Sequence, residues 1–145
     1  MRIRSLLTGL LALLLGCKSQ PPAPPDHPRL SPSVRLQDVT FHSAALGRSM
    51  EYRVVLPAEL SPGQSLHVIY LLHGGGGGFR DWTNYSDVAH YADEGILLVM
   101  PEGESSYYMN SATRVQDRFE DYITHDLIAD VEEKFPVRRQ GEDRA

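Results

Sequence analysis

Hydrophobic and polar residues follow three patterns along the chain. Residues 6–15 are almost all apolar. Residues 50–56 alternate between apolar and polar side chains, and residues 35–42 do so more weakly, which predicts an antiparallel pair of strands with one face in water. Residues 66–72 and 96–100 are nearly continuous apolar runs, which predict strands that are covered on both faces.

Two further segments are predicted to be helical. In residues 117–135 the apolar side chains recur at spacings of three and four, and Pro136 ends the pattern. A shorter helix is predicted over residues 86–93, because a serine can cap its N-terminus and Gly95 follows as a stop signal. The order strand, strand, strand, helix, strand, helix is typical of the opening part of an α/β domain with a mainly parallel sheet.

Five consecutive glycines, Gly74 to Gly78, follow directly after the strand predicted over residues 66–72 and His73. Such a run costs backbone entropy, so its position after a buried strand indicates a use for bare backbone. Right-handed crossovers would place it at the carboxyl edge of the sheet, where ligands bind in α/β domains. Backbone N–H groups at such a position can form an oxyanion hole, with Gly74, Gly75 and Gly76 as the candidate donors.

Two phosphate-binding interpretations of the glycine run fail on its ending. A Walker loop closes with Gly-Lys-Ser/Thr, whereas Phe79 and Arg80 follow Gly78 here. A dinucleotide fingerprint starting at Gly74 would require glycine where Phe79 stands. The strand-His-Gly-Gly-Gly pattern fits the oxyanion loop of lipases and esterases, and a flexible connector is the remaining alternative.

The N-terminus has the pattern of a bacterial lipoprotein signal. Two arginines precede the apolar residues 6–15, which are too few to span a membrane. Residues 14–17, Leu-Leu-Gly-Cys, resemble the lipobox, in which the cysteine is lipidated after cleavage behind the glycine. We therefore expect a signal peptide over residues 1–16 and a lipid anchor at Cys17, the alternative being an ordinary secretory peptide. Lys18 permits sorting to an outer membrane, and the expected location is the periplasmic or extracellular face of the cell envelope.

Residues 17–33 are predicted to be a linker between this anchor and the domain. Six of the ten prolines of the chain fall in it, and such a composition favours an extended spacer. The domain is expected over residues 34–145. The chain is acidic, with a formal net charge of −5 and no basic cluster, which argues against nucleic acid as a partner.

Three aromatic residues are candidates for a substrate cleft: Trp82 beside the glycine run, and Tyr107 and Tyr108 in a polar loop. The alternative for each is packing of a loop on the sheet edge. The six histidines show no spacing typical of metal ligands, so we expect neither a metal nor another cofactor.

Together these features resemble the esterase family of the α/β-hydrolase fold, which includes S-formylglutathione hydrolase, tributyrin and feruloyl esterases, and mycolyltransferases. The resemblance implies a serine esterase, or a related acyltransferase, acting on a small-molecule or glycan-linked acyl ester. It also implies that Gly75 is the main oxyanion donor. The similarity covers the following segments: residues 52–57, 68–77, 81–82, 99–104, 122–128, 135–137 and 144–145.

In this family the catalytic histidine follows the serine in the chain, so His73 and His125 are expected to be structural or solvent-facing. The serine, the acid and the histidine all lie beyond the position matched by Ala145. The segment closest to a nucleophile turn, residues 103–107, lacks the second glycine. We therefore expect an N-terminal fragment without catalytic residues, inactive by itself. A non-catalytic surface lipoprotein that binds glycan or lipid is the alternative.

The resemblance also places the strand at 66–72 between the strand at 96–100 and the family's nucleophile strand. Without that neighbour, an apolar strand would form an exposed edge, which favours aggregation. The 145-residue chain is therefore expected to be only marginally folded by itself.

Overall fold

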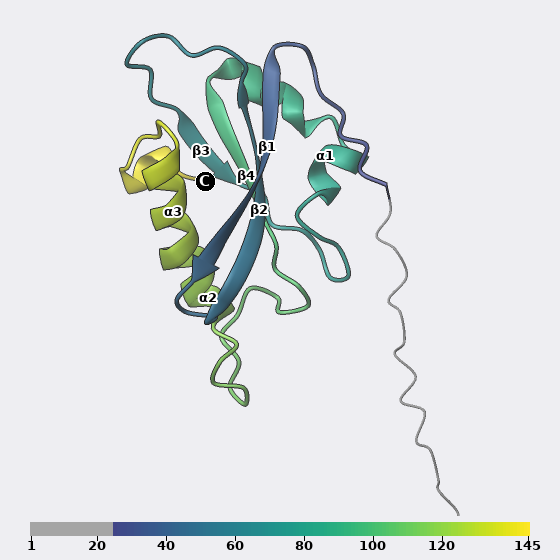
Figure 1. Cartoon of the computed structure of the whole chain (residues 1–145), viewed down its shortest axis with the longest axis vertical. Coiled ribbons are helices and arrows are strands. Elements are labelled where there is room, and N and C mark those ends of the chain that lie inside the picture. Colours follow the sequence, from purple (N-terminus) through teal and green to yellow (C-terminus); the bar gives the residue numbers. More distant parts are fainter. Residues whose placement is uncertain (1–24) are drawn as a thin grey trace, which may run out of the picture.

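The computed structural model describes residues 25–145, which form one mixed sheet with helices on both faces (Figure 1). The order in the sheet is β1-β2-β4-β3. β1 pairs antiparallel with β2, β2 pairs antiparallel with β4, and β3 runs parallel to β4. The strands are β1 (Val34–Ser43), β2 (Arg48–Pro57), β3 (His67–Tyr70) and β4 (Ile96–Pro101). All four predicted strands are present, and the antiparallel opening followed by parallel pairing is confirmed.

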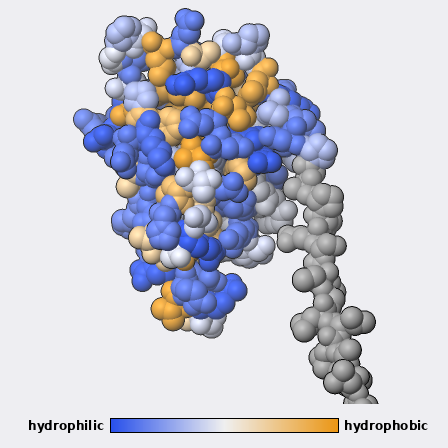
Figure 2. All heavy atoms as spheres, in the orientation of Figure 1, coloured by the Kyte–Doolittle hydropathy of each residue, from blue (hydrophilic) through white to orange (hydrophobic). Residues whose placement is uncertain are grey.

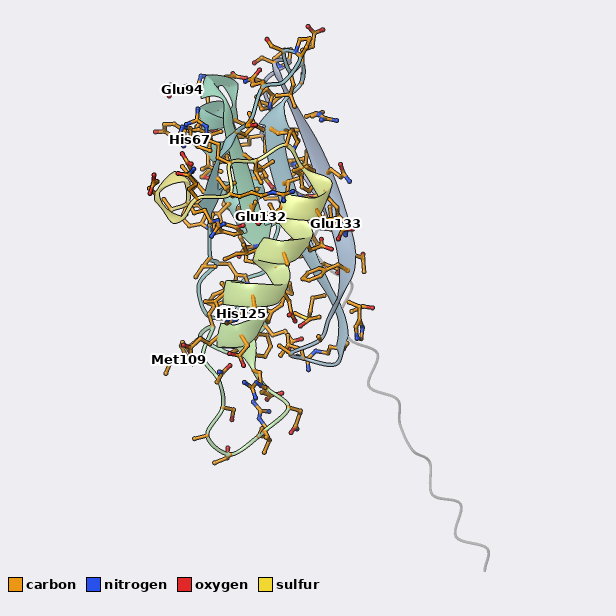
Figure 3. The ribbon with its side chains drawn as sticks, turned by 90° about the vertical axis from the view of Figure 1, so that its left-hand side faces the viewer. His67, Glu94, Met109, His125, Glu132 and Glu133 are labelled. Atoms are coloured by element: carbon orange, nitrogen blue, oxygen red, sulfur yellow. The ribbon has the colours of Figure 1, made fainter. Side chains whose placement is uncertain are left out.

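The longer predicted helix is confirmed but is not a regular α-helix throughout. It consists of α2 (Phe119–Asp121), a π-helical turn η2 (Tyr122–Leu127) and α3 (Ile128–Lys134). Figure 3 shows this continuous helix lying across the sheet, with His125 on its lower part and Glu132 and Glu133 further up. His125 is exposed and its ring hydrogen-bonds with the neighbouring Thr124 hydroxyl, in agreement with the solvent-facing position expected for it.

The shorter predicted helix is present as a 3₁₀ helix, η1 (Val88–Glu94), and a five-residue helix that was not predicted, α1 (Asp81–Tyr85), precedes it. The predicted N-cap at Ser86 is wrong, because Asp87 holds that position and Ser86 ends α1. Gly95 ends η1 in the left-handed conformation with φ +82°, which confirms it as the stop signal. A further 3₁₀ turn, η3 (Gly141–Asp143), lies near the C-terminus.

The core has two parts, one on each face of the sheet. On one face Tyr52, Val54 and Leu56 of β2 pack with apolar residues of the helix formed by α2, η2 and α3. On the other face Val55 packs with apolar residues of β4 and η1. On the face seen in Figure 2, hydrophobic side chains gather in the upper half among hydrophilic ones.

The prediction that the antiparallel pair has one face in water holds at one end of β2 and fails at the other. Ser49 and Glu51 on the predicted wet face are exposed, whereas Arg53 and Val55 on the same face are completely buried. The alternation of β2 is real, but η1 and the segment before β1 cover the second face at Arg53 and Val55. An alternating pattern reports the polarity of the two faces and not whether another segment covers the polar one.

The outer edge of β3 is partly paired, which corrects the expectation of a bare edge. Residues near the C-terminus form parallel bridges with it, Leu66 with Val137 and Val68 with Arg144. The Ala145 N–H donates to the Val68 carbonyl at 3.0 Å, and the Tyr70 N–H donates to the Ala145 carbonyl at 2.7 Å.

The predicted signal peptide over residues 1–16, Cys17 and the predicted linker as far as residue 24 lie outside the described residues. Residues 25–33 of that linker are described, and the segment 26–31 contacts the domain. Within residues 25–145 no helix is long and apolar enough to cross a bilayer.

Candidate active site

The glycine run forms a tight turn at the carboxyl end of β3. The Gly77 N–H donates to the Gly74 carbonyl at 3.1 Å, so residues 74–77 make one β-turn. Gly76, at the third position, has φ +77°, as a type II turn requires. A side chain on Gly77 would collide with the Asp81 carboxylate. Gly76 and Gly77 are thus fixed by backbone conformation and by packing.

Gly74 and Gly75 are not explained in this way. A Cβ added to either would meet no atom within 4 Å. Within residues 25–145 the N–H groups of Gly74, Gly75 and Gly76 have no hydrogen-bond acceptor, whereas the Gly78 N–H donates to Asp81 Oδ2 at 3.2 Å. The open part of the turn therefore offers three free backbone donors, which is the chemistry of an oxyanion hole.

His73 connects the turn to the segment after β4. Its Nε2 accepts a hydrogen bond from the Gly103 N–H at 2.9 Å, and its Nδ1 lies 2.8 Å from the Gly74 carbonyl. This pattern assigns the neutral tautomer with the proton on Nδ1. Glu102 Oε1 is 3.4 Å from the same Nε2, but that nitrogen already accepts a hydrogen bond, so the contact is not an ion pair in this tautomer. His73 is buried and shapes the turn, in agreement with the structural role expected for it.

Glu102 is a site residue that sequence reasoning missed. Its Oε2 accepts the Phe79 N–H at 3.3 Å, and its Oε1 accepts the Glu104 N–H at 2.7 Å. One carboxylate thus joins the end of the glycine run to the loop after β4. The sequence shows Glu102 directly after a buried strand and a proline, but nothing in that pattern identifies its acceptors.

The three aromatic candidates lie on two sides of the turn. Tyr107 and Tyr108 line a pocket of about 230 Å³ together with His73, Gly74 and Gly75. Trp82 does not line this pocket. It borders a neighbouring hollow of about 240 Å³ on the other side of His73 and Gly74. The structure therefore brings the two tyrosines together with Gly74 and Gly75 in one pocket and places Trp82 in the neighbouring hollow.

Tyr108 also supports the turn, through a hydrogen bond with the backbone of His73. Its hydroxyl accepts the His73 N–H at 3.0 Å, and burial raises the pKa of the phenol to about 12. Its ring occupies the space where a side chain on Gly103 would stand. Trp82 acts similarly from the other side, because its indole N–H donates to the Leu72 carbonyl at 3.1 Å.

Neither a metal site nor a serine hydroxyl hydrogen-bonded to a histidine is present among the described residues. Within residues 25–145 no three His, Cys, Asp or Glu side chains are arranged to hold a metal ion. Ser106 Oγ donates to the Gly103 carbonyl at 2.6 Å, and no histidine in this part of the chain contacts it or Ser105.

Comparison with known proteins identifies the family of this chain. Residues 43–145 match the family model described as "Putative esterase", so the chain belongs to this esterase family. An acetyl esterase of Caldicellulosiruptor saccharolyticus is 21% identical in an alignment that covers 74% of this chain and 43% of that enzyme.

Solved structures show the fold. The serine hydrolase FphF of Staphylococcus aureus superposes with a TM-score of 0.69 at 24% identity, over 77% of this chain and 45% of FphF. The ferulic acid esterase AmCE1/Fae1A of Anaeromyces mucronatus, solved with ferulic acid, superposes with a TM-score of 0.59 at 16% identity. That match covers 77% of this chain and 47% of the esterase. This chain thus spans less than half the length of each of these three proteins. The resemblance to esterases and the α/β-hydrolase type of sheet are confirmed.

Proposed function

We propose that this chain is part of a serine esterase in which the turn at Gly74–Gly77 stabilises the oxyanion. The observation that supports it most directly is the set of three free N–H donors of Gly74, Gly75 and Gly76, of which Gly74 and Gly75 line a pocket, in a chain that belongs to an esterase family. As a serine attacks the ester carbonyl, negative charge develops on the carbonyl oxygen. A backbone donor placed for that charge is worth about 3 kcal/mol of barrier.

The serine, its acid and its histidine are proposed to be supplied by sequence that follows Ala145. Support comes from the pairing at the edge of β3, where Ala145 hydrogen-bonds in parallel with Val68 and Tyr70. A chain continuing in that direction would run along β3 toward its carboxyl end and so reach the glycine turn. The 145-residue chain alone is then inactive, and its acyl ester substrate and any acyltransferase activity belong to the whole protein.

Attachment to the cell envelope is the second part of this proposal. It is supported by the lipobox-like residues 14–17 and by Cys17 as the one cysteine of the chain. Labelling of expressing cells with a radioactive fatty acid tests it, because the wild-type protein should incorporate label and a Cys17→Ser variant should not.

The oxyanion role can be tested with two variants at one position. Gly75 occupies the second position of a type II turn, which proline favours, so Gly75→Pro removes the N–H while keeping the turn. Gly75→Ala is the matched control, since it keeps the N–H and its Cβ meets no other atom. The protein for this test is the product of the reading frame that continues past Ala145 into a Gly-x-Ser-x-Gly sequence.

With p-nitrophenyl acetate, kcat should fall by about 100-fold or more in Gly75→Pro and by less than about threefold in Gly75→Ala. Equal activity of the two variants would remove Gly75 from the oxyanion hole. Hydrolysis by the 145-residue chain itself would contradict its proposed inactivity. If no continuation with a nucleophile turn is encoded, the lipoprotein that binds glycan or lipid becomes the better hypothesis.

A further inference from the structure

We propose that residues 26–31, called here the strap, hold α1 and through it the oxyanion turn in position, with Arg53 as the central connection. The catalytic meaning of this positioning role rests on the proposed esterase function, whereas the mechanical connection does not. In Figure 1 the strap runs beside α1, on the opposite side of the molecule from the C-terminus.

Arg53 is the connection between the strap, the sheet and α1. Its side chain is completely buried, and all five guanidinium N–H groups have acceptors. Asp26 of the strap accepts two of these hydrogen bonds, at 3.0 and 2.6 Å, and Asp38 of β1 accepts two, at 2.6 and 2.9 Å. Thr83 Oγ1 of α1 accepts the fifth at 2.8 Å. One side chain thus joins three segments that are far apart in sequence.

Asp26 is difficult to replace, because every N–H group of the Arg53 guanidinium is hydrogen-bonded and Asp26 accepts two of them. A buried guanidinium is tolerated only when its charge and its donors are matched, and removal of one partner leaves the rest uncompensated. Without the Asp26 carboxylate, two N–H groups would point toward the strap with no acceptor. The strap is therefore bound through a charge pair that the folded domain needs and is not simply laid against the surface.

Two more hydrogen bonds join the strap directly to α1. The His27 N–H donates to Asn84 Oδ1 at 3.2 Å, and the Arg29 N–H donates to the Thr83 carbonyl at 2.8 Å. α1 has five residues, too few for a helix to be stable by its own hydrogen bonds. Its position therefore depends on what holds it from outside, and the strap supplies these two hydrogen bonds directly and a third connection through Arg53.

α1 in turn holds the glycine run. The Gly78 N–H donates to Asp81 Oδ2, the Asp81 N–H donates to the Gly78 carbonyl at 3.1 Å, and the Trp82 indole donates to Leu72. Phe79, the residue after the run, lies under two guanidinium groups, with Arg53 at 5.8 Å and Arg80 at 5.0 Å from its ring centre. Displacement of α1 would loosen both ends of the turn that presents the oxyanion donors. Such donors are effective only while they are held in place before the reaction.

Hydrogen exchange of the 145-residue chain measures this connection without any catalysis. The test variant is Asp26→Asn. The control is Asp87→Asn, because Asp87 also pairs with the strap, through Arg29 at 3.4 Å, but is 83% exposed. The reporting amides are those of Gly77, Gly78 and Asp81, which are hydrogen-bonded in the wild type.

In Asp26→Asn these amides should exchange about tenfold faster, the change expected from losing charged hydrogen bonds, while the amides shared by β2 and β4 keep their wild-type rates. Asp87→Asn should leave both sets unchanged. Unchanged rates at the turn in Asp26→Asn, or an equal increase over the whole domain, would overturn the proposal.

If Asp26→Asn does not fold, Thr83→Val removes the acceptor that α1 offers to Arg53, together with the hydrogen bond that Thr83 Oγ1 donates to the Arg80 carbonyl at 3.0 Å. The same local acceleration is expected. An acceleration spread evenly over the sheet would again overturn the connection through α1. Because esterase activity is not measured, failure of the strap proposal and failure of the proposed function are distinguishable.

Discussion

The four glycines of the turn at residues 74–77 have different tasks, although they are the same amino acid. Gly76 supplies a positive φ, Gly77 makes room for Asp81, and Gly74 and Gly75 leave the approach to free N–H groups open. The sequence indicated that bare backbone was needed after β3. It could not show which glycines were needed. That depends on which side chain lies against each glycine, such as Asp81 against Gly77, and on whether a hydrogen-bond acceptor faces each N–H group.

Alanine substitutions should separate these tasks in stability measurements. Gly77→Ala pushes the Asp81 carboxylate away from the Gly78 N–H and should lower the free energy of unfolding by about 1–2 kcal/mol. Gly74→Ala meets no atom and has no positive φ to oppose it, so it should be neutral or stabilising by up to about 1 kcal/mol. Urea unfolding curves of both variants test this. Equal losses would mean that packing does not distinguish the two positions.

Asp26 should make the stability of the domain sensitive to acid. Its hydrogen bonds with Arg53 hold the pKa of the Asp26 carboxyl below its usual value, with smaller contributions from Asn84 and Arg80. A lowered folded pKa gives stability that is present above the unfolded pKa of about 3.9 and is lost as the pH falls through the folded value.

The acid sensitivity can be isolated with Asp26→Asn. Urea unfolding between pH 6 and pH 3 should give a difference in free energy between wild type and variant that is largest near pH 6 and shrinks toward pH 3. A difference that stays constant with pH would show that the carboxylate charge contributes nothing.

At the scale of elements, the sequence predicted nearly everything that depends on apolar patterning. Both continuous runs became strands, the alternating segments became a hairpin, and the long helix followed its period. The π-helical turn in that helix has no sequence signal, because it changes the hydrogen-bond spacing without changing which residues are apolar. Arg53 was misassigned because its burial depends on Asp26, Asp38 and Thr83, which no single strand pattern contains.

The contact between the sheet and the long helix includes a partly buried hydrogen bond that should matter for stability. The Tyr52 hydroxyl donates to Asp130 Oδ2 at 2.6 Å, and burial, followed by the Asp130 carboxylate, holds the pKa of this phenol far above its usual range. Tyr52→Phe should therefore cost about 1.5–3 kcal/mol of unfolding free energy.

Lys134→Gln is the control for that measurement, because Lys134 pairs with the same carboxylate from a more exposed position. It should cost less than about 1 kcal/mol. Thermal or urea unfolding of the two variants gives the comparison. A larger loss of unfolding free energy in Lys134→Gln would mean that Lys134, and not Tyr52, is the more important partner of Asp130.

For the whole molecule, the outer edge of β3 is the feature that most affects behaviour in solution. The parallel bridges of Val137 and Arg144 pair only part of it. Removal of residues 141–145 should expose the hydrogen-bonding groups of Val68 and Tyr70 and promote association between edges. Size-exclusion chromatography with light scattering should then show concentration-dependent oligomers, and an unchanged elution and mass would mean that these residues do not protect the edge.

The attachment of the strap at Asp26 also sets the length of chain that is free between the proposed anchor and the domain. If Cys17 carries the proposed lipid, nine residues join the anchor to the first fixed point of the domain, and a fully extended chain of that length reaches at most about 32 Å. A linker that ran free to residue 33 would reach about 25 Å further. The contact between Asp26 and Arg53 would thus shorten the free part of the linker and keep α1 and the glycine turn near the bilayer surface.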